Sequence, residues 1–158
     1  MFALDPGLTR GATALLDLPL CTVLLKDDAR WPWLLLVPRL AGVTDIGELS
    51  DADASRLMGE VRQAARAVRA EHGVTGINIG ALGNIVAQLH VHVVGRWVGD
   101  PAWPGPVWGV EGRTPYGVAG APTSSLMAGG SEEPSQRLAP QPSQKAVVIA
   151  RLSARLGT

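Results

Sequence analysis

Three polar side chains alternate with apolar ones in one short stretch of the chain. The segment QLHVHVVGR, residues 88–96, places Gln88, His90 and His92 two positions apart, with leucine or valine between them. Because successive side chains of a β-strand point to opposite faces, a strand over residues 86–95 would line one face with the glutamine and both histidines. The intervening leucine and valines would then pack into the hydrophobic core on the other face.

This row admits three interpretations that differ in chemistry. It can be structural, because an exposed strand face can carry histidine. It can bind a metal, because His-x-His on a strand brings two imidazoles together, although Gln88 is a poor third ligand and His72 is expected at a helix end. It can be catalytic, because a neutral imidazole attacks phosphorus and acyl centres, and an ordinary histidine pKa near ~6.5 leaves that form available at neutral pH. The preceding GALGN segment, residues 80–84, can turn backbone N–H groups toward an anion.

The elements that position this row are predicted from apolar runs and turn residues. Over residues 1–108 the expected order is a helix, two strands, a long helix and two further strands. The runs at 19–27 and 32–39 are rich in β-formers and are joined by a short polar turn, which favours a hairpin. Residues 74–84 and 85–96 supply the other two strands. These connections favour an α+β fold with a mainly antiparallel sheet, one long helix and one short helix.

The long helix has a defined start and end in the sequence. Ser50 is a good N-cap residue, and Asp53 follows three positions later, as in a carboxylate variant of the capping box. Gly73 is expected to end the helix. Between these limits, apolar residues recur at helical spacing, namely Leu57, Val61, Ala65 and Val68.

Composition and charge exclude several classes of function. Of 158 residues, 14 are basic and 14 acidic, so no net charge attracts nucleic acid or a membrane surface, and an anionic ligand must be held by a local site. Cys21 is the single cysteine, so no internal disulfide or cysteine-based zinc site is expected. Its side chain is expected to be small and buried in the core. No apolar run approaches the ~18 residues of a spanning helix, and no signal peptide is recognised. We therefore expect a cytoplasmic protein.

The composition changes near residue 109. Residues 109–144 are rich in Gly, Pro, Ser and Ala without a sustained period, which is typical of a loop or a disordered segment. Residues 145–156 carry apolar side chains at helical spacing and predict a short terminal helix. The expected organisation is a catalytic domain over residues 1–108, followed by a flexible tail over residues 109–158.

The motif QLHVHVV resembles the signature of the histidine triad (HIT) family, in which three histidines alternate with hydrophobic residues, except that Gln88 stands at the first position. LLLVPRLAGVTDIGELSDAD is similar to the family's strand ending in proline, followed by a loop and a helix, and INIGALGN is similar to its approach to the triad strand. DPAWPGPVWG, residues 100–109, is similar to a bacterial subgroup with glutamine at the first triad position. The resemblance covers roughly residues 2–109 and implies a HIT-like fold.

The resemblance also implies a nucleotide-phosphate hydrolase or a nucleotidyl transferase. His90 would attack the α-phosphate and carry a nucleotidyl-histidine intermediate, His92 would assist the phosphate and the leaving group, and Gln88 would orient His90 or contact a phosphate oxygen. Diadenosine polyphosphates and nucleoside phosphoramidates are the implied substrate classes. The phosphate-binding and nucleotide-binding positions that it implies are Asn78, Gly83, Asn84, Asp27 or Asp28, and Trp103.

The resemblance further implies a homodimer that acts on a small-molecule nucleotide and needs neither a cofactor nor a metal. Because an amide at position 88 does not titrate as an imidazole does, a nucleotide-binding module or sensor with little turnover is the alternative. Other side chains have two interpretations each. Trp31 and Trp33 either wall a base pocket or pack in the core or a dimer interface, and Arg96 either reaches a phosphate or is solvated at the strand end.

Overall fold

One antiparallel sheet organises the protein. The computed structural model describes residues 1–117 and 144–157, and its five strands follow the order β1-β2-β3-β5-β4, with every neighbouring pair antiparallel. This arrangement confirms the predicted α+β fold, and the β2–β3 pairing confirms the predicted hairpin. The strands are β1 Ala12–Asp17, β2 Cys21–Lys26, β3 Trp33–Pro38, β4 Gly76–Gly80 and β5 Val91–Arg96.

The long helix begins where the sequence predicts. Helix α2 spans Asp51–Arg69, and the Oγ atom of Ser50 accepts a hydrogen bond from the Asp53 amide. The helix ends slightly earlier than expected, with Ala70 as its C-cap. The chain then turns at Gly73, whose φ of 81° suits glycine. The other helical elements are α1 Pro6–Thr9, α3 Gln144–Leu156 and two 3-10 turns, Ile46–Glu48 and Val107–Gly109.

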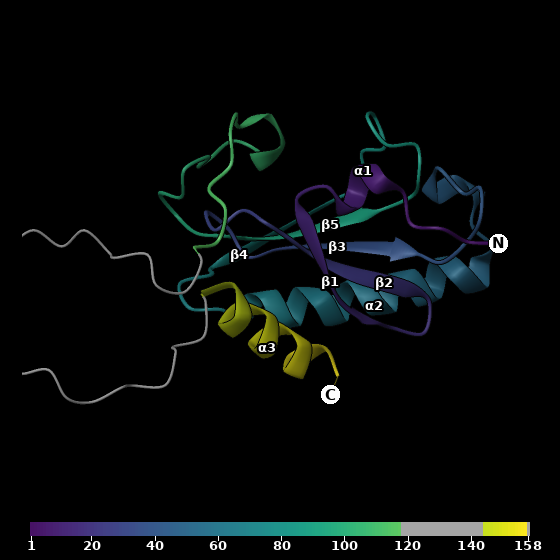
Figure 1. The fold of residues 1–158 in the computed structure, drawn as a ribbon, viewed down its shortest axis with the longest axis horizontal. Helices are drawn as coiled ribbons and strands as arrows, with labels where there is room; N and C mark the ends of the chain where they lie inside the picture. Colours follow the sequence, from purple (N-terminus) through teal and green to yellow (C-terminus); the bar gives the residue numbers. More distant parts are fainter. Residues whose placement is uncertain (118–143, 158) are drawn as a thin grey trace, which may run out of the picture.

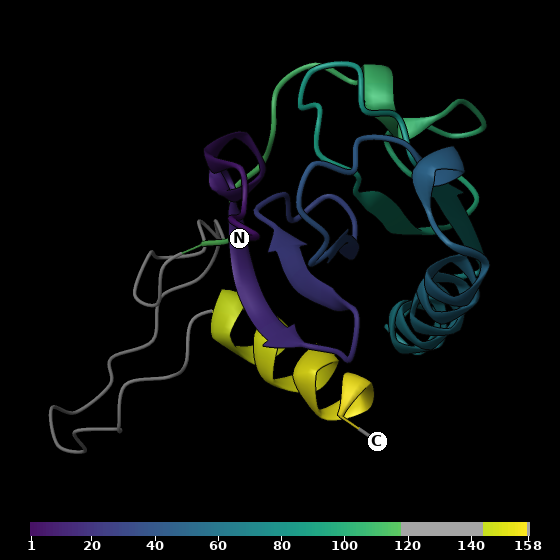
Figure 2. The same ribbon diagram turned by 90° about the vertical axis from the view of Figure 1, so that its right-hand side faces the viewer.

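The two faces of the sheet are covered differently. Helices α2 and α3 lie on one face, while α1 and the segment that follows β5 lie on the other (Figures 1 and 2). The face toward α2 and α3 packs apolar side chains of β2, β3 and β5, including Val23, Leu36 and Val93. The other face carries His92 and a second apolar cluster built around Trp33 and Leu35. The site residues therefore lie on the face that the long helix does not cover.

Two predicted elements differ from the structure. The first part of the chain forms only the single turn α1 and then strand β1, because Gly11, at a φ of 85°, turns the chain into an extended segment that pairs with β2. The strand expected over residues 85–96 begins only at Val91. Residues 85–90 form a loop instead, in which the Leu89 amide donates to the Val43 carbonyl rather than to a neighbouring strand.

The C-terminal helix is part of the packed structure. Helix α3 buries Val148, Leu152 and Leu156 in the same core as α2, and the Arg151 guanidinium lies 2.6 Å from the Glu71 carboxylate. Tyr116 is also buried in that core. The packed core thus extends beyond the boundary expected after residue 108, whereas residues 118–143 of the expected tail lie outside the described residues.

The helices that the structure describes include none with both the length and the hydropathy to cross a membrane.

Candidate active site

His90 and His92 lie side by side at the start of β5. Their ring centroids are 4.9 Å apart. Strand pairing places His92 in one row with Leu35 on β3 and Gly80 on β4. His90 is the last residue of the loop that leads into β5. The two imidazoles therefore reach the same face from a strand and from its entry loop, not from one continuous strand.

A backbone carbonyl fixes the orientation of His90. The Nδ1 atom of His90 lies 2.7 Å from the backbone oxygen of Gln88. Because a carbonyl oxygen only accepts, Nδ1 carries the proton in this contact, and the lone pair of the neutral ring is on Nε2. The residue is 7% exposed and lines a cavity. This tautomer gives His90 the nucleophilic nitrogen that phosphoryl chemistry requires.

His92 has the opposite tautomer. The indole Nε1–H of Trp33 donates to Nδ1 of His92 over 3.0 Å, so the proton of the neutral ring is on Nε2. Burial, together with the charges of His90 and Lys26, lowers the pKa of His92 to about 3. His92 is thus a neutral hydrogen-bond donor at physiological pH.

Acid should weaken the fold through His92. Its pKa in the folded protein, about 3, lies below the ordinary value of 6.5, so between these values the unfolded chain binds a proton that the folded chain does not. The free energy of unfolding therefore decreases as pH falls through this window, by at most about 1.4 kcal/mol per pH unit. The lowered pKa values of Asp28 and Asp100 act in the same direction, but mainly below about pH 4.

Urea unfolding of the wild type and of His92→Asn at pH 6 and pH 4.5 isolates this effect. The asparagine can still accept from the Trp33 indole but does not titrate. We expect the wild type to lose about 2 kcal/mol more than the variant between the two pH values. Equal losses in both proteins would contradict a neutral, buried His92.

Two cavities meet at His92. The first, of about 330 Å³, is lined by both histidines and by residues of α1 and the loop before β5. The second, of about 400 Å³, extends toward Asp28 and Arg30. We call the joined space the cleft, because five residues line both cavities, namely Arg10, Gly11, Lys26, His92 and Trp108.

The shared part of the cleft is cationic. Lys26 has no carboxylate within ion-pair distance among the residues that the structure describes, and its ammonium lies 5.0 Å from the Trp33 ring centroid. Burial lowers the pKa of Lys26. Arg10 lines both cavities as well. In a chain without net charge, these two side chains supply the local positive charge that an anionic ligand requires.

The structure brings some of the sequence-predicted residues into the cleft. Gly83 and Asn84 line the first cavity together with His90 and His92, and Gly83 has a φ of 66°, so the GALGN turn does curve beside the imidazoles. Gln88 lies outside the lining residues of both cavities. Its backbone carbonyl, not its side-chain amide, contacts His90.

Asn78 and Trp103 belong to a different network. The Oδ1 atom of Asn78 accepts a hydrogen bond from Arg96, and Trp103 is exposed, with its ring centroid 5.9 Å from the Arg96 guanidinium carbon. Neither residue lines the cleft. Arg96 itself is buried against Asp100, so it neither reaches the cleft nor lies solvated at the strand end. The buried guanidinium therefore bonds to the Asn78 oxygen, which was expected to lie near a phosphate.

The carboxylates of Asp27 and Asp28 form contacts with the chain after residue 110. Asp27 lies 3.2 Å from the Lys145 ammonium and accepts from the Tyr116 amide, and it does not line the cleft. Asp28 does border the second cavity, but both of its carboxylate oxygens accept hydrogen bonds from Arg30. Neither position therefore presents a free carboxylate for the expected ribose contact.

The cleft also contains residues that the sequence did not assign to it. Trp108 packs edge-on against His92, with centroids 6.0 Å apart. It fits because Gly80 has no side chain, and a Cβ atom there would lie 3.0 Å from the Trp108 ring. Lys26 shares the His92 face of the sheet with Trp33, one of the two tryptophans considered as pocket walls, which lines the second cavity. Alternation along β2 was the signal that could have placed Lys26 there.

Within residues 1–117 and 144–157, no three His, Cys, Asp or Glu side chains are clustered in a way that could hold a metal ion.

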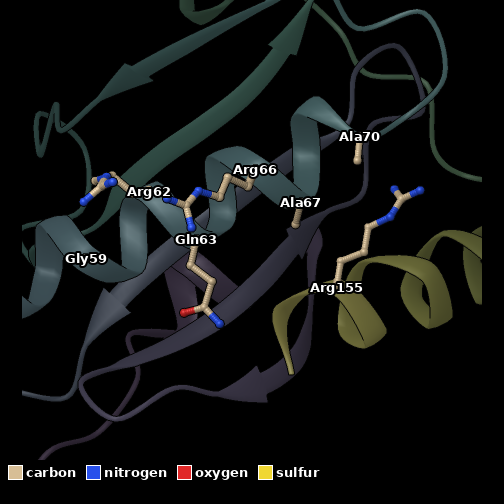
Figure 3. A pocket seen from close by; sticks show the side chains of 7 residues that line it. All are labelled: Gly59, Arg62, Gln63, Arg66, Ala67, Ala70 and Arg155. Carbon is tan, nitrogen blue, oxygen red and sulfur yellow. The ribbon is translucent and has the colours of Figure 1, made fainter. Parts of the chain in front are cut away.

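Another cavity lies away from the histidines. It has a volume of about 680 Å³ between α2 and α3. Figure 3 shows Arg62 and Arg66 projecting from α2, and Arg155 from α3. The Arg155 guanidinium is bonded to Glu71. This cavity contains neither of the imidazoles and is separate from the cleft.

An antiparallel α+β domain thus holds two imidazoles of opposite tautomer in a cationic cleft, an arrangement suited to an anionic ligand. Residues 10–98, more than half of the chain, match the HIT domain family, and the chain belongs to that family.

Solved structures and a curated relative extend the comparison. A histidine triad protein from Marinobacter aquaeolei VT8 has a TM-score of 0.79 and 37% identity, covering 99% of this chain and 97% of that one. A histidine triad protein from Sinorhizobium meliloti 1021 has a TM-score of 0.71 and 46% identity over 73% and 86% of the two chains. An AP-4-A phosphorylase of Mycobacterium tuberculosis is 36% identical over 75 residues, which are 44% of this chain but only 38% of that protein's length.

Proposed function

We propose that this protein transfers a nucleoside monophosphate group from a nucleotide to water or another acceptor through a nucleotidyl-histidine intermediate on His90. The observation that carries the proposal is the contact between His90 Nδ1 and the Gln88 carbonyl, which leaves the Nε2 lone pair of a cavity-lining imidazole available for attack. Gln88 at the first triad position is also proposed to mark a subgroup of the family.

The first step forms a bond between His90 Nε2 and the α-phosphorus. The bond from that phosphorus to the leaving oxygen or nitrogen breaks, and the electron pair departs with the leaving group. The ring is then an N-phosphorylated imidazolium, whose Nδ1 proton still contacts the Gln88 carbonyl. That carbonyl stabilises the positive charge of the intermediate.

The second step restores the enzyme. Water attacks the same phosphorus, the N–P bond breaks with its electron pair returning to Nε2, and the proton of the water passes to solvent. In both steps His92 donates an Nε2–H hydrogen bond to a phosphoryl oxygen. Because Nδ1 of His92 already accepts from Trp33, His92 cannot gain a second proton there, so it stabilises charge as a neutral donor.

The chemistry of the cleft favours a polyphosphate-bearing substrate. Lys26 and Arg10 lie where the two cavities join, so their charges flank a phosphate chain that passes His92. The family membership and the Mycobacterium tuberculosis AP-4-A phosphorylase similarity support nucleotide processing. Diadenosine polyphosphates are the first proposed substrates, and nucleoside phosphoramidates are the second.

A small substrate panel tests this function. Diadenosine polyphosphates, a nucleoside phosphoramidate and an acyl-adenylate are incubated with the wild type, with and without a chelator, and nucleoside monophosphate release is followed by chromatography. We expect release from at least one substrate, at a rate that the chelator leaves unchanged within about twofold, because no step needs a metal. Tight nucleotide binding without release from any substrate would instead favour the sensor alternative.

The homodimer stays a prediction. Strand β4 is an edge of the sheet, and Ile79 on it is 50% exposed, which makes this edge the proposed contact between two copies. Sedimentation analysis measures the state directly.

A further inference from the structure

We infer that Gln88 is a positioning residue that holds the N-terminal segment, residues 1–11, as one wall of the cleft. The kinetic part of this inference rests on the proposed function, whereas its structural part does not.

The side chain of Gln88 bonds to the backbone of that segment at two points. Its Oε1 atom accepts from the Asp5 amide over 2.9 Å, and its Nε2 atom donates to the Ala3 carbonyl over 2.8 Å. This pairing resembles that of a neighbouring β-strand. Both polar atoms of the amide therefore have backbone partners, and neither contacts an imidazole.

The held segment forms part of the cleft. Asp5 caps α1 by accepting from the Gly7 amide over 2.6 Å, and Leu8 is buried in the core cluster on the His92 face. Gly7, Leu8 and Arg10 line the same cavity as His90. The cation at position 10 thus reaches the cleft only because the segment is folded back onto the loop before β5.

The fit between the segment and that loop is close. A Cβ atom on Gly7 would lie 2.8 Å from a methyl carbon of Val86, two positions before Gln88. The loop before β5 therefore contacts the segment through van der Waals packing as well as through the amide. Because packing alone is not directional, the two hydrogen bonds set the register of the segment.

Gln88 thus acts on the site in two separable ways. Its backbone carbonyl orients His90, and its side chain fixes the wall that carries Arg10. A substitution at position 88 keeps the carbonyl and removes only the side-chain contacts. Loss of the side chain should therefore affect nucleotide binding far more than the attack by His90.

The test combines hydrogen exchange with kinetics on the full chain. In Gln88→Met, which keeps the length of the side chain but not its polar atoms, we expect amide exchange in residues 2–9 to accelerate at least about tenfold, as expected from losing two hydrogen bonds. The KM for the nucleotide should rise about tenfold, and kcat should change by less than about threefold.

A second pair of variants separates the hydrogen bond from general disruption. Asp5→Pro removes the N–H that Gln88 binds, and the φ of −63° at this position suits proline. Asp5→Ala keeps that N–H while losing the same cap. We expect Asp5→Pro to raise KM more than Asp5→Ala does, and this excess to disappear when residue 88 is methionine, whereas Asp5→Ala and Gln88→Met should be additive.

Two results would overturn the inference. One is a fall in kcat with unchanged exchange in residues 2–9, because Gln88 would then act on the reacting atoms. The other is full additivity of Asp5→Pro with Gln88→Met. If the wild type has no turnover but Gln88→Met still accelerates exchange and weakens AMP binding measured by calorimetry, the inference stands and only the proposed function fails.

Discussion

His90→Gln is expected to reduce nucleotide turnover by at least about 10³-fold, the order of magnitude lost when a catalytic nucleophile is removed. The glutamine side chain is similar in size to the imidazole and remains polar, but it offers no nitrogen lone pair that can attack phosphorus. Steady-state release of nucleoside monophosphate measures the effect.

A matched variant controls for the loss of any imidazole. His72 is exposed beyond the end of α2 and does not line the cleft, so His72→Gln should change turnover by less than about twofold. Because binding depends on Lys26 and Arg10 as well, His90→Gln should keep its nucleotide affinity within about tenfold. Turnover by His90→Gln at a rate close to the wild type would show that another group attacks.

Asp100→Asn is expected to lower the free energy of unfolding by about 3–5 kcal/mol, the range for breaking a buried ion pair. The Arg96 side chain is 3% exposed, and its Nε atom lies 2.6 Å from the Asp100 carboxylate. Hydrogen bonds from Arg96 and from nearby backbone amides lower the pKa of Asp100 to about 2, against the opposing effect of burial, so the pair is charged at neutral pH. Removing the negative charge leaves the buried guanidinium without its counter-ion.

The control is the same substitution at a surface pair. The Asp17 side chain is 64% exposed and 3.4 Å from Arg39, and Asp17→Asn should cost no more than about 1 kcal/mol. Urea unfolding at neutral pH compares the two variants. A loss for Asp100→Asn as small as that for Asp17→Asn would contradict a structural role for the buried pair.

The Arg96–Asp100 pair also bears on the site. The Asp100 carboxylate accepts from the Trp97 and Ala102 amides, and Arg96 donates to the Gly105 carbonyl. These bonds fix the segment after β5, which brings Trp108 against His92. We therefore expect the pair to act on the cleft through the position of this segment.

Local signals in the sequence were sufficient for much of the fold. The Ser50 cap and the polar turn between β2 and β3 are contacts between near neighbours, and both were predicted correctly. Strand β1 was missed because its pairing with β2 gives it only half-buried side chains, which weakens the apolar pattern by which strands are recognised.

The site was harder to predict because its decisive contacts are distant in sequence. His90 and His92 were placed together by strand alternation, and the structure keeps them adjacent despite the shorter strand. Gln88, in contrast, bonds to Ala3 and Asp5, more than 80 positions away. The family resemblance assigned Asn78 to the phosphate, and no sequence pattern indicates that the buried Arg96 donates to its oxygen.

Trapping the covalent intermediate tests the central claim most directly. The wild type is mixed with a labelled adenylated substrate, quenched during turnover under basic conditions, and analysed by peptide mass spectrometry. We predict a base-stable, acid-labile adenylyl adduct on His90 that is absent from His90→Gln. Rapid turnover with no adduct, or with the adduct on another residue, would contradict the nucleotidyl-histidine mechanism.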